Sequence, residues 1–258
     1  MVDASVIGCG NMGGALVRGL VLAGYDDLIV CDVDPRALDA IDSLGVRTTT
    51  DPAEATDADI VFLAVKPNIV ETVLEDIHLD SDQTIVSIAA GIPRTVISRH
   101  TAANVVRVMP NLAAEWGSMA AAITGEHINE EIVTMLDAVG EVVELDESQM
   151  DTATALNGSG PAFVFYLIQA MTEAGVDRGL EHEDARTLAA QTFKGAAETV
   201  QRSDTSLDDL IEAVCSPQGT TIEGMAILEE SSVADDLDAA IGAAEERATE
   251  LSMEIANE

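Results

Sequence analysis

The sequence predicts an α/β fold in which an N-terminal, doubly wound parallel sheet is followed by an all-helical domain. Three observations indicate this. Short apolar segments of strand length alternate with segments of helical periodicity up to about residue 145. A glycine-rich turn, "GCGNMGG", joins the first strand to the first helix. After residue 150 the apolar spacing is helical only. With 258 residues, 47% of them apolar, the chain is long enough for two domains.

The N-terminal part alternates strand and helix in a regular order. The segment "DIVFLAVKP" is nearly all apolar, as expected of a strand covered on both faces of a sheet. Pro35 and Gly45 delimit a helix between them. Such alternation predicts crossover connections and therefore parallel strands. The predicted strands span residues 4–8, 27–34, 45–50, 59–67, 83–91, 104–111, 118–125 and 141–145, and the helices between them span 9–24, 35–45, 67–77, 93–100 and 129–140.

The C-terminal part predicts helices only. The helix "PAFVFYLIQAM" is apolar nearly all round, which predicts burial between subunits as well as within one. The pattern changes near Glu147, so we place one domain at residues 1–149 and a second at 150–258. The predicted helices here span residues 150–158, 161–179, 182–202 and 207–214 and much of 224–258.

The chain is strongly acidic. Forty-seven Asp and Glu residues face 12 Lys and Arg residues, giving a net charge of −35, and the acids are spread along the whole sequence. One interpretation is a surface adapted to the cytosol of a salt-adapted (halophilic) organism, where such repulsion is screened. The alternative is an ordinary acidic protein. In either case the electrostatic field repels nucleic acid and anionic membranes, so neither is an expected partner.

Cysteine usage and the N-terminal residues favour a cytoplasmic protein. Cys9, Cys31 and Cys215 have no CxxC or CxH spacing, which indicates reduced thiols and no metal site. The start "MVDASVIGCG" lacks the basic region of a signal peptide. No apolar run is long enough for a membrane span. The four histidines lie far apart and suggest no catalytic dyad.

The stretch "VIGCGNMGG" places Gly8, Gly10 and Gly13 in a G-x-G-x-x-G pattern between a strand and a helix. In a Rossmann domain the first glycine permits the tight turn and the second lets a dinucleotide pyrophosphate approach the backbone. The third lets helix and strand pack closely, and the pyrophosphate lies at the helix N-terminus. The context predicts a Rossmann domain that binds NADH or NADPH.

The second strand ends in "VCDVDPR", which bears on the choice of cofactor. Asp32 follows Gly10 by 22 positions, where an acid accepts hydrogen bonds from the adenosine ribose and repels a 2′-phosphate. Arg36 is close enough to favour the phosphate instead. The choice between NADH and NADPH therefore stays open, with NADH slightly favoured. Asp34 is also a candidate N-cap for the helix at Pro35.

The ends of the later strands complete the predicted cofactor site. In an open α/β sheet, ligands bind at the carboxyl ends of the strands, where "AVKP", "SIAAGI" and "RVMPN" lie. Lys66 is one of only two lysines in the chain, and the small residues leave room for a nicotinamide ring. The predicted cofactor-binding residues are Ile7, Gly8, Gly10, Asn11, Met12, Gly13, Asp32, Arg36, Ala64, Val65, Lys66, Pro67, Ala89, Ala90 and Asn111.

The stretch "SPQGTTIEG" interrupts the helical part at residues 216–224. Gly219 removes side-chain bulk, and Thr220 and Thr221 open the next helix, so free N–H groups are available for a small anion such as a carboxylate. Thr220 and Glu223 also have the spacing of a capping box. A binding loop is the favoured interpretation, and it is compatible with a capping role for the same residues.

Taken together, "VIGCGNMGGALVRGL", "FLAVKP", "VVRVMPN", "TALNGSGPAFVF" and "SPQGTTIEGMAILEE" resemble pyrroline-5-carboxylate reductase over essentially the whole chain. The resemblance implies NAD(P)H-dependent reduction of L-1-pyrroline-5-carboxylate to L-proline, the last step of proline biosynthesis. It also implies a helical dimerisation domain and a homodimer, often assembled into a decamer. It assigns Thr221 to the substrate ring nitrogen, as the catalytic contact, and Ser216, Gly219 and Thr220 to the substrate carboxylate.

The sequence departs from the family pattern at three positions. Gln218 stands where glycine is usual, Leu112 where threonine is usual, and Ala213 where some members have a polar cofactor contact. An imine is readily protonated by water, so orientation beside the cofactor suffices without a catalytic His or Asp. The alternatives are a reductase of another small imine, a hydroxy-acid dehydrogenase, and a non-catalytic regulator that binds the cofactor.

Overall fold

The computed structural model describes residues 3–256 of the chain. It divides into two compact units, Met1–Ser159 with Gly242–Glu258, and Gly160–Ile241. This division differs from the predicted one at residues 149 and 150. Met150 and Ala153 are buried in a small core with Ala122 of the sheet, so the segment after residue 149 belongs to the first unit. The end of the chain also returns to that unit, where Ala248 is buried.

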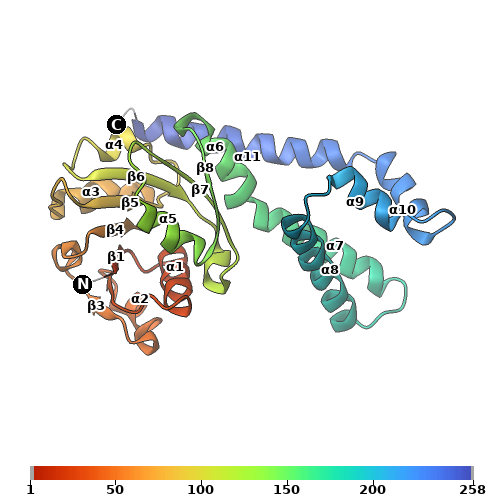
Figure 1. Cartoon of the computed structure of the whole chain (residues 1–258), viewed down its shortest axis with the longest axis horizontal. Helices are drawn as coiled ribbons and strands as arrows, with labels where there is room; N and C mark the ends of the chain where they lie inside the picture. Colours follow the sequence, from red (N-terminus) through yellow and green to blue (C-terminus); the bar gives the residue numbers. More distant parts are fainter. Residues whose placement is uncertain (1–2, 257–258) are drawn as a thin grey trace. The chain divides into compact units, whose positions relative to one another are not determined.

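The first unit is built on an eight-stranded sheet of order β3-β2-β1-β4-β5-β6-β7-β8 (Figure 1). Strands β1 to β6 are parallel, as predicted. Strand β7 runs antiparallel to β6, and β8 is parallel to β7, which was not predicted. The link between β6 and β7 holds only residues 110–118, too few for a crossover. The strands are β1 Ala4–Ile7, β2 Leu28–Cys31, β3 Arg47–Thr49, β4 Ile60–Leu63, β5 Thr84–Ser87, β6 Asn104–Met109, β7 Met119–Gly125 and β8 Gly140–Glu144.

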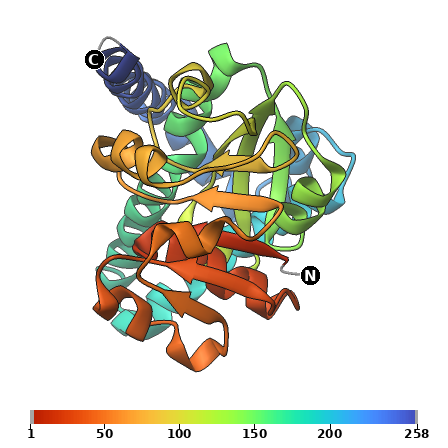
Figure 2. The same ribbon diagram turned by 90° about the vertical axis from the view of Figure 1, so that its left-hand side faces the viewer.

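Helices cover both faces of the sheet, which confirms the doubly wound arrangement (Figure 2). One core contains Leu16 and Leu20 of α1 and Leu136 of α5, packed against the inner strands. The other contains Leu74 of α3 and Ile97 of α4. The helices of this layer are α1 Asn11–Leu22, α2 Pro35–Asp39, α3 Val70–Asp76, α4 Arg94–Ile97 and α5 Glu130–Asp137.

Several predicted helices are shorter in the structure. The predicted helix 35–45 divides into α2, which ends at Asp39 with Ala40 as its C-cap, and a 3-10 turn at Asp42–Leu44. The predicted helix 150–158 begins as α6, Met150–Ala153, and continues as a π-helical turn, η6, at Thr154–Gly158. Such π turns are rare and often lie at functional sites. The 3-10 turns are η1 Asp42–Leu44, η2 Pro52–Thr56, η3 Pro67–Ile69, η4 Leu112–Trp116 and η5 Glu147–Gln149.

The second unit is entirely helical among the described residues and has almost no core of its own. Its helices are α7 Gly160–Val176, α8 His182–Arg202, α9 Leu207–Val214, α10 Thr220–Glu229 and the first part of α11 Val233–Ala256. Helices α7 and α8 pack together (Figure 1), and buried residues are confined to Thr172, Ala185 and Ala189. Fourteen large apolar side chains are exposed on this unit: Val164, Phe165, Tyr166, Met171, Val176, Leu180, Leu188, Val200, Leu207, Ile211, Val214, Ile222, Ile227 and Leu228.

An exposed apolar surface of this extent marks an association surface. It agrees with the predicted burial of α7 between subunits. Between residues 3 and 256, no helix has the length and apolarity required to traverse a lipid bilayer.

Candidate cofactor site

The first unit contains a cavity of about 630 Å³ at the carboxyl ends of β1, β4, β5 and β6. This is the edge at which open α/β sheets bind their ligands. Nine of the predicted cofactor residues line it, together with Ile88, Met109, Pro110, Leu112 and Gly158. The nine are Gly10, Asn11, Met12, Ala64, Val65, Lys66, Ala89, Ala90 and Asn111.

The three motif glycines have three different surroundings. Gly8 has φ +100°, and a Cβ there would lie 2.6 Å from the Ala64 oxygen, so only glycine fits the turn. A Cβ on Gly13 would collide with the main-chain oxygen of Gly8, because α1 packs directly on the strand end. At Gly10 a Cβ would meet nothing within 4 Å. Gly10 is therefore free of packing constraints and leaves its backbone open to the cavity.

Helix α1 points its N-terminus at this cavity. Its N-cap is Gly10, and no side chain caps it, so the first N–H groups of the helix remain available. Gly10 and Asn11 both line the cavity. Free N–H groups, the helix dipole and an unobstructed glycine form a site for a phosphate group. The residues present thus fit the pyrophosphate of a dinucleotide.

Lys66 follows β4 and lines the same cavity. Within residues 3–256 the structure gives it no carboxylate partner, so its charge is available to an anionic ligand. Pro67, also predicted as a contact, does not line the cavity and instead occupies the first position of η3. Its rigid φ starts that turn directly after the lysine.

Asp32 and Arg36 lie beyond the carboxyl end of β2 and outside the cavity lining. The Asp32 carboxylate accepts hydrogen bonds from the main-chain N–H groups of Cys9 (2.7 Å) and Asp34 (2.9 Å). Arg36 forms an ion pair with Asp34 at 2.9 Å, and Asp34 caps α2, as predicted. Hydrogen bonds from the Arg36 side chain and main chain lower the pKa of Asp34.

The two cysteines beside this carboxylate are buried thiols. Burial, and then the charge of Asp32, raises the pKa of Cys9. Burial is also the largest cause at Cys31, followed by the charges of Asp32, Asp51 and Glu54, and together they raise its pKa to about 11. Both thiols are therefore protonated near neutral pH. The carboxylates of Asp32, Asp51 and Glu54 therefore bring negative charge to the ends of β2 and β3.

One wall of the cavity depends on Asn157, whose importance the sequence did not reveal. Its side-chain amide donates to the main-chain oxygens of Met109 (2.7 Å) and Ala120 (2.8 Å). The side chain of Asn111 donates to the main-chain oxygen of Asn157 at 3.2 Å. Next in sequence, a Cβ on Gly158 would approach the Met109 methyl to 2.5 Å. These partners lie far away in the sequence, so they are set by the tertiary fold.

The predicted substrate loop lies in the second unit. A tight turn runs from Ser216 to Gly219, whose N–H donates to the Ser216 oxygen at 2.9 Å, and a Cβ on Gly219 would meet the Ser216 hydroxyl. Gln218 has φ 61°, in the left-handed region where glycine is usual. Thr220 and Thr221 are exposed and open α10, as predicted.

The capping box considered for this loop is not formed. The N-cap of α10 is Gly219, and no side chain caps the helix. Thr220 is already the first helical residue, so its hydroxyl is one position too late to cap. The first N–H groups of α10 are consequently left without a capping side chain. This is the condition that an anion-binding loop requires.

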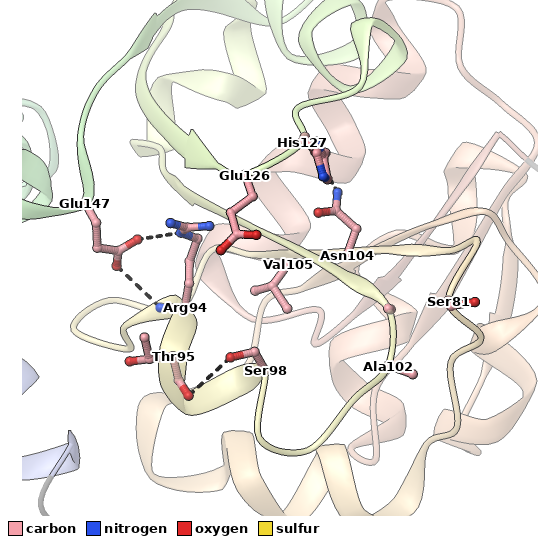
Figure 3. A pocket seen from close by; sticks show the side chains of 11 residues that line it. Ser81, Arg94, Thr95, Ser98, Ala102, Asn104, Val105, Glu126, His127 and Glu147 are labelled. Carbon is pink, nitrogen blue, oxygen red and sulfur yellow. Dashed lines mark hydrogen bonds and ion pairs between the residues drawn. The ribbon is translucent and has the colours of Figure 1, made fainter.

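A second cavity of about 340 Å³ lies at the opposite ends of the strands (Figure 3). Arg94 and Glu147 face each other across one side of it and form an ion pair at 2.7 Å. Glu147 also contacts the buried Arg107 at 3.0 Å. Burial opposes ionisation of Glu147, but hydrogen bonds from both arginines outweigh it and lower its pKa. This cluster has the features of a structural ion-pair network.

No group of three or more His, Cys, Asp or Glu side chains that could hold a metal ion occurs within residues 3–256.

Two family models match parts of the chain. One, described as an NADP oxidoreductase, coenzyme F420-dependent, matches residues 4–91. The other, described as pyrroline-5-carboxylate reductase dimerisation, matches residues 147–251.

Individual proteins match over nearly their whole length. The chain is 38% identical to a pyrroline-5-carboxylate reductase of Methanosarcina acetivorans, covering 95% of this chain and 96% of that protein. The corresponding enzyme of Corynebacterium melassecola is 36% identical, with 97% and 99% covered. A solved pyrroline-5-carboxylate reductase of Coxiella burnetii superposes with a TM-score of 0.88 at 33% identity, covering 97% and 98%. A Plasmodium falciparum relative solved with NADP bound gives 0.84 at 28% identity, with the same coverage.

Proposed function

Because this chain belongs to the pyrroline-5-carboxylate reductase family, we propose that it reduces L-1-pyrroline-5-carboxylate to L-proline with NADPH or NADH. The observation that carries the proposal is the cavity at the carboxyl edge of the sheet, with an unobstructed Gly10 and the N-terminus of α1 beside it. Bound NAD(P)H supplies the hydride. The protein's task is to hold the cofactor and the imine in a reactive orientation.

Each part of the cavity has a separate role in this proposal. The backbone at Gly10 and Asn11 binds the pyrophosphate, and Lys66 adds positive charge. The nicotinamide ring lies beside the small residues Ala89 and Ala90 and the side chain of Asn111, all of which line the cavity. Ile7, Gly8 and Gly13 act indirectly: they shape the turn and the packing of α1 on the sheet.

We assign substrate binding to the loop that precedes α10. Its uncapped N–H groups suit the carboxylate of the substrate, together with Ser216, Gly219 and Thr220. The Thr221 hydroxyl hydrogen-bonds the ring nitrogen and thereby orients the C=N bond. No acid–base side chain is required, because the protonated imine accepts hydride directly. Leu112 lines the cofactor cavity as an apolar wall in place of the usual threonine.

The protein associates with itself. The match to the dimerisation model covers the helical part, and the second unit exposes the apolar side chains that such an interface buries. We propose a homodimer as the functional unit, with a decamer as a further level of assembly.

We also propose a cytoplasmic location, in keeping with the free thiols of Cys9, Cys31 and Cys215.

The decisive experiment measures oxidation of NADH and NADPH by the purified protein with L-1-pyrroline-5-carboxylate, at low and high KCl. We expect turnover that falls at least about a hundredfold in Thr221→Ala, the order of effect of losing one positioned hydrogen-bonding group. Thr221→Ser, which keeps the hydroxyl, should retain most activity. Thr205→Ala, an exposed threonine before α9, is the matched control.

A second set of substrates tests the competing function. A six-membered cyclic imine with a carboxylate presents the same chemistry in a larger ring. Faster turnover of that ring than of the five-membered one would contradict the proposed substrate while leaving the reaction type intact. Cofactor binding without turnover of either imine would favour the non-catalytic alternative.

A further inference from the structure

The residues after β2 hold one carboxylate in a fixed position. Asp32 accepts the Cys9 N–H through Oδ2 at 2.7 Å and the Asp34 N–H through Oδ1 at 2.9 Å. Cys9 belongs to the same glycine-rich turn that carries Gly8 and Gly10. Rotating the Asp32 carboxylate away would break both hydrogen bonds. Its place relative to the proposed pyrophosphate site is therefore set by the backbone.

The positive charge nearest in sequence is already paired. Arg36 donates from Nε to Asp34 Oδ1 (3.1 Å) and from Nη2 to Oδ2 (2.9 Å), a bidentate pair. Asp34 also accepts the main-chain N–H of Arg36. The Arg36 side chain is 87% exposed, so the ion pair itself adds little stability and the guanidinium could leave it. Its departure would, however, leave Asp34 as a bare carboxylate.

Further acids surround the same edge. Asp51 follows β3, the neighbour of β2, and both Asp51 and Glu54 act electrostatically on Cys31 at the end of β2. Four carboxylates, those of Asp32, Asp34, Asp51 and Glu54, thus follow β2 and β3 in the chain, and Arg36 pairs with one of them, Asp34. Arg47 lies opposite Ile29 in the register of β3 and β2, which places it two residues before the carboxyl end of β2. The edge carries a net negative charge whichever partner Arg36 takes.

We propose that Asp32 makes this protein bind NADH in preference to NADPH. The ribose 2′-hydroxyl of NADH can donate a hydrogen bond to the fixed carboxylate. The 2′-phosphate of NADPH has no proton to donate, and it brings negative charge to an edge that is already negative. Recruiting Arg36 to the phosphate would not change the total charge, because Asp34 would lose its partner. This inference deepens the proposed function by choosing between its two cofactors.

The test measures dissociation constants of NADH and NADPH by calorimetry on the full-length protein, without substrate. We expect NADH to bind at least about tenfold more tightly, and Asp32→Asn to reduce that ratio severalfold or reverse it. Asp34→Ser, which keeps an N-cap and frees Arg36, should strengthen NADPH binding alone. Arg36→Gln should leave the ratio within about twofold. Lower ionic strength should increase the preference, because screening weakens the repulsion.

Several outcomes would overturn the proposal. Equal or tighter binding of NADPH by the unmodified protein is one. A selective loss of NADPH binding in Arg36→Gln is another, because it would mean that Arg36 serves the phosphate. If neither cofactor binds, the cofactor cavity itself is wrong and this inference falls with it. The measurement needs no turnover, so an error in the substrate assignment leaves it unaffected.

Discussion

The side-chain amide of Asn157 lies 2.7 Å from the main-chain oxygen of Met109 and joins a π-helical turn to the end of β6. The same amide reaches Ala120 on β7. One side chain therefore ties together three segments beside the cofactor cavity. The Met109 oxygen lies at the end of β6 and the Ala120 oxygen near the start of β7, so the amide bridges two antiparallel strands beside the turn that joins them.

Replacing Asn157 should disturb both stability and cofactor binding. Asn157→Ala leaves two main-chain oxygens without this donor, so we expect a loss of about 1–3 kcal/mol in the free energy of unfolding. The dissociation constant of the cofactor should rise severalfold because the wall at Met109 loosens. Asn104→Ala is the control: its amide also bridges to a main-chain oxygen, that of His127 at 2.7 Å, but at the opposite end of β6. Equal effects of both variants on cofactor affinity would contradict the role of Asn157.

The two glycines of the turn should respond differently to alanine. In Gly10→Ala the added methyl group meets no protein atom, so the unfolding temperature should change little. The affinity for the cofactor should fall at least about tenfold, because the methyl group occupies the site of the pyrophosphate. Gly8→Ala combines φ +100° with a contact at 2.6 Å and should lower stability strongly. Thermal unfolding and cofactor titration measure the two effects. Unchanged affinity in Gly10→Ala would place the pyrophosphate elsewhere.

The ion pairs of Glu147 predict a defined pH dependence. The pKa of Glu147 is lowered in the folded protein, so its contribution to stability is present above the ordinary pKa of 4.5 and is lost as pH falls through the lowered value. At pH 7, Glu147→Gln should cost roughly 2–3 kcal/mol, less than a fully buried pair because Glu147 is 31% exposed. Denaturant unfolding at pH 7 and at acid pH should show the difference shrinking. The exposed Glu144→Gln should show no such trend.

Gln218 adopts a left-handed conformation that glycine adopts more easily. Gln218→Gly should therefore gain up to about 1 kcal/mol in the free energy of unfolding, and Gln218→Val should lose at least as much. Thermal unfolding of the two variants, at equal protein concentration, measures this. If both variants unfold at the temperature of the unmodified protein, the left-handed turn is not maintained in solution.

The exposed apolar face of α7 should decide the oligomeric state. Phe165 is 68% exposed in the single chain, and Phe165→Asp should weaken self-association measured by sedimentation velocity. Leu22→Asp changes a side chain that is 72% exposed on α1 of the first unit and should leave the oligomer intact. Dissociation by Leu22→Asp alone would move the interface to the first unit.

The sequence was sufficient for the parts of the fold that rest on local patterns. The strand–helix alternation, the glycine turn and the start of α10 at Thr220 follow from periodicity and turn chemistry. The reversal of β7 was not predictable from its apolar pattern, because that pattern is the same in either strand direction. The Asn157 contacts could not be predicted because their partners lie 37 to 48 residues away in sequence. The spacing of Thr220 and Glu223 predicted a capping box with Thr220 as the N-cap. The prediction was wrong because Gly219 takes the N-cap position of α10.

Helix α11 has a consequence for how the protein can be divided. Its final turns belong to the first unit, where Ser252 donates to Asp151 at 3.1 Å and Ile255 packs against the core beneath β4 and β5. A fragment ending at residue 159 would contain every strand and every residue of the cofactor cavity, yet it would leave that surface uncovered. An independently folding cofactor unit would need residues 242–256 attached through a short linker. The helical unit, Gly160–Ile241, is in effect an insertion into the sequence of the cofactor unit.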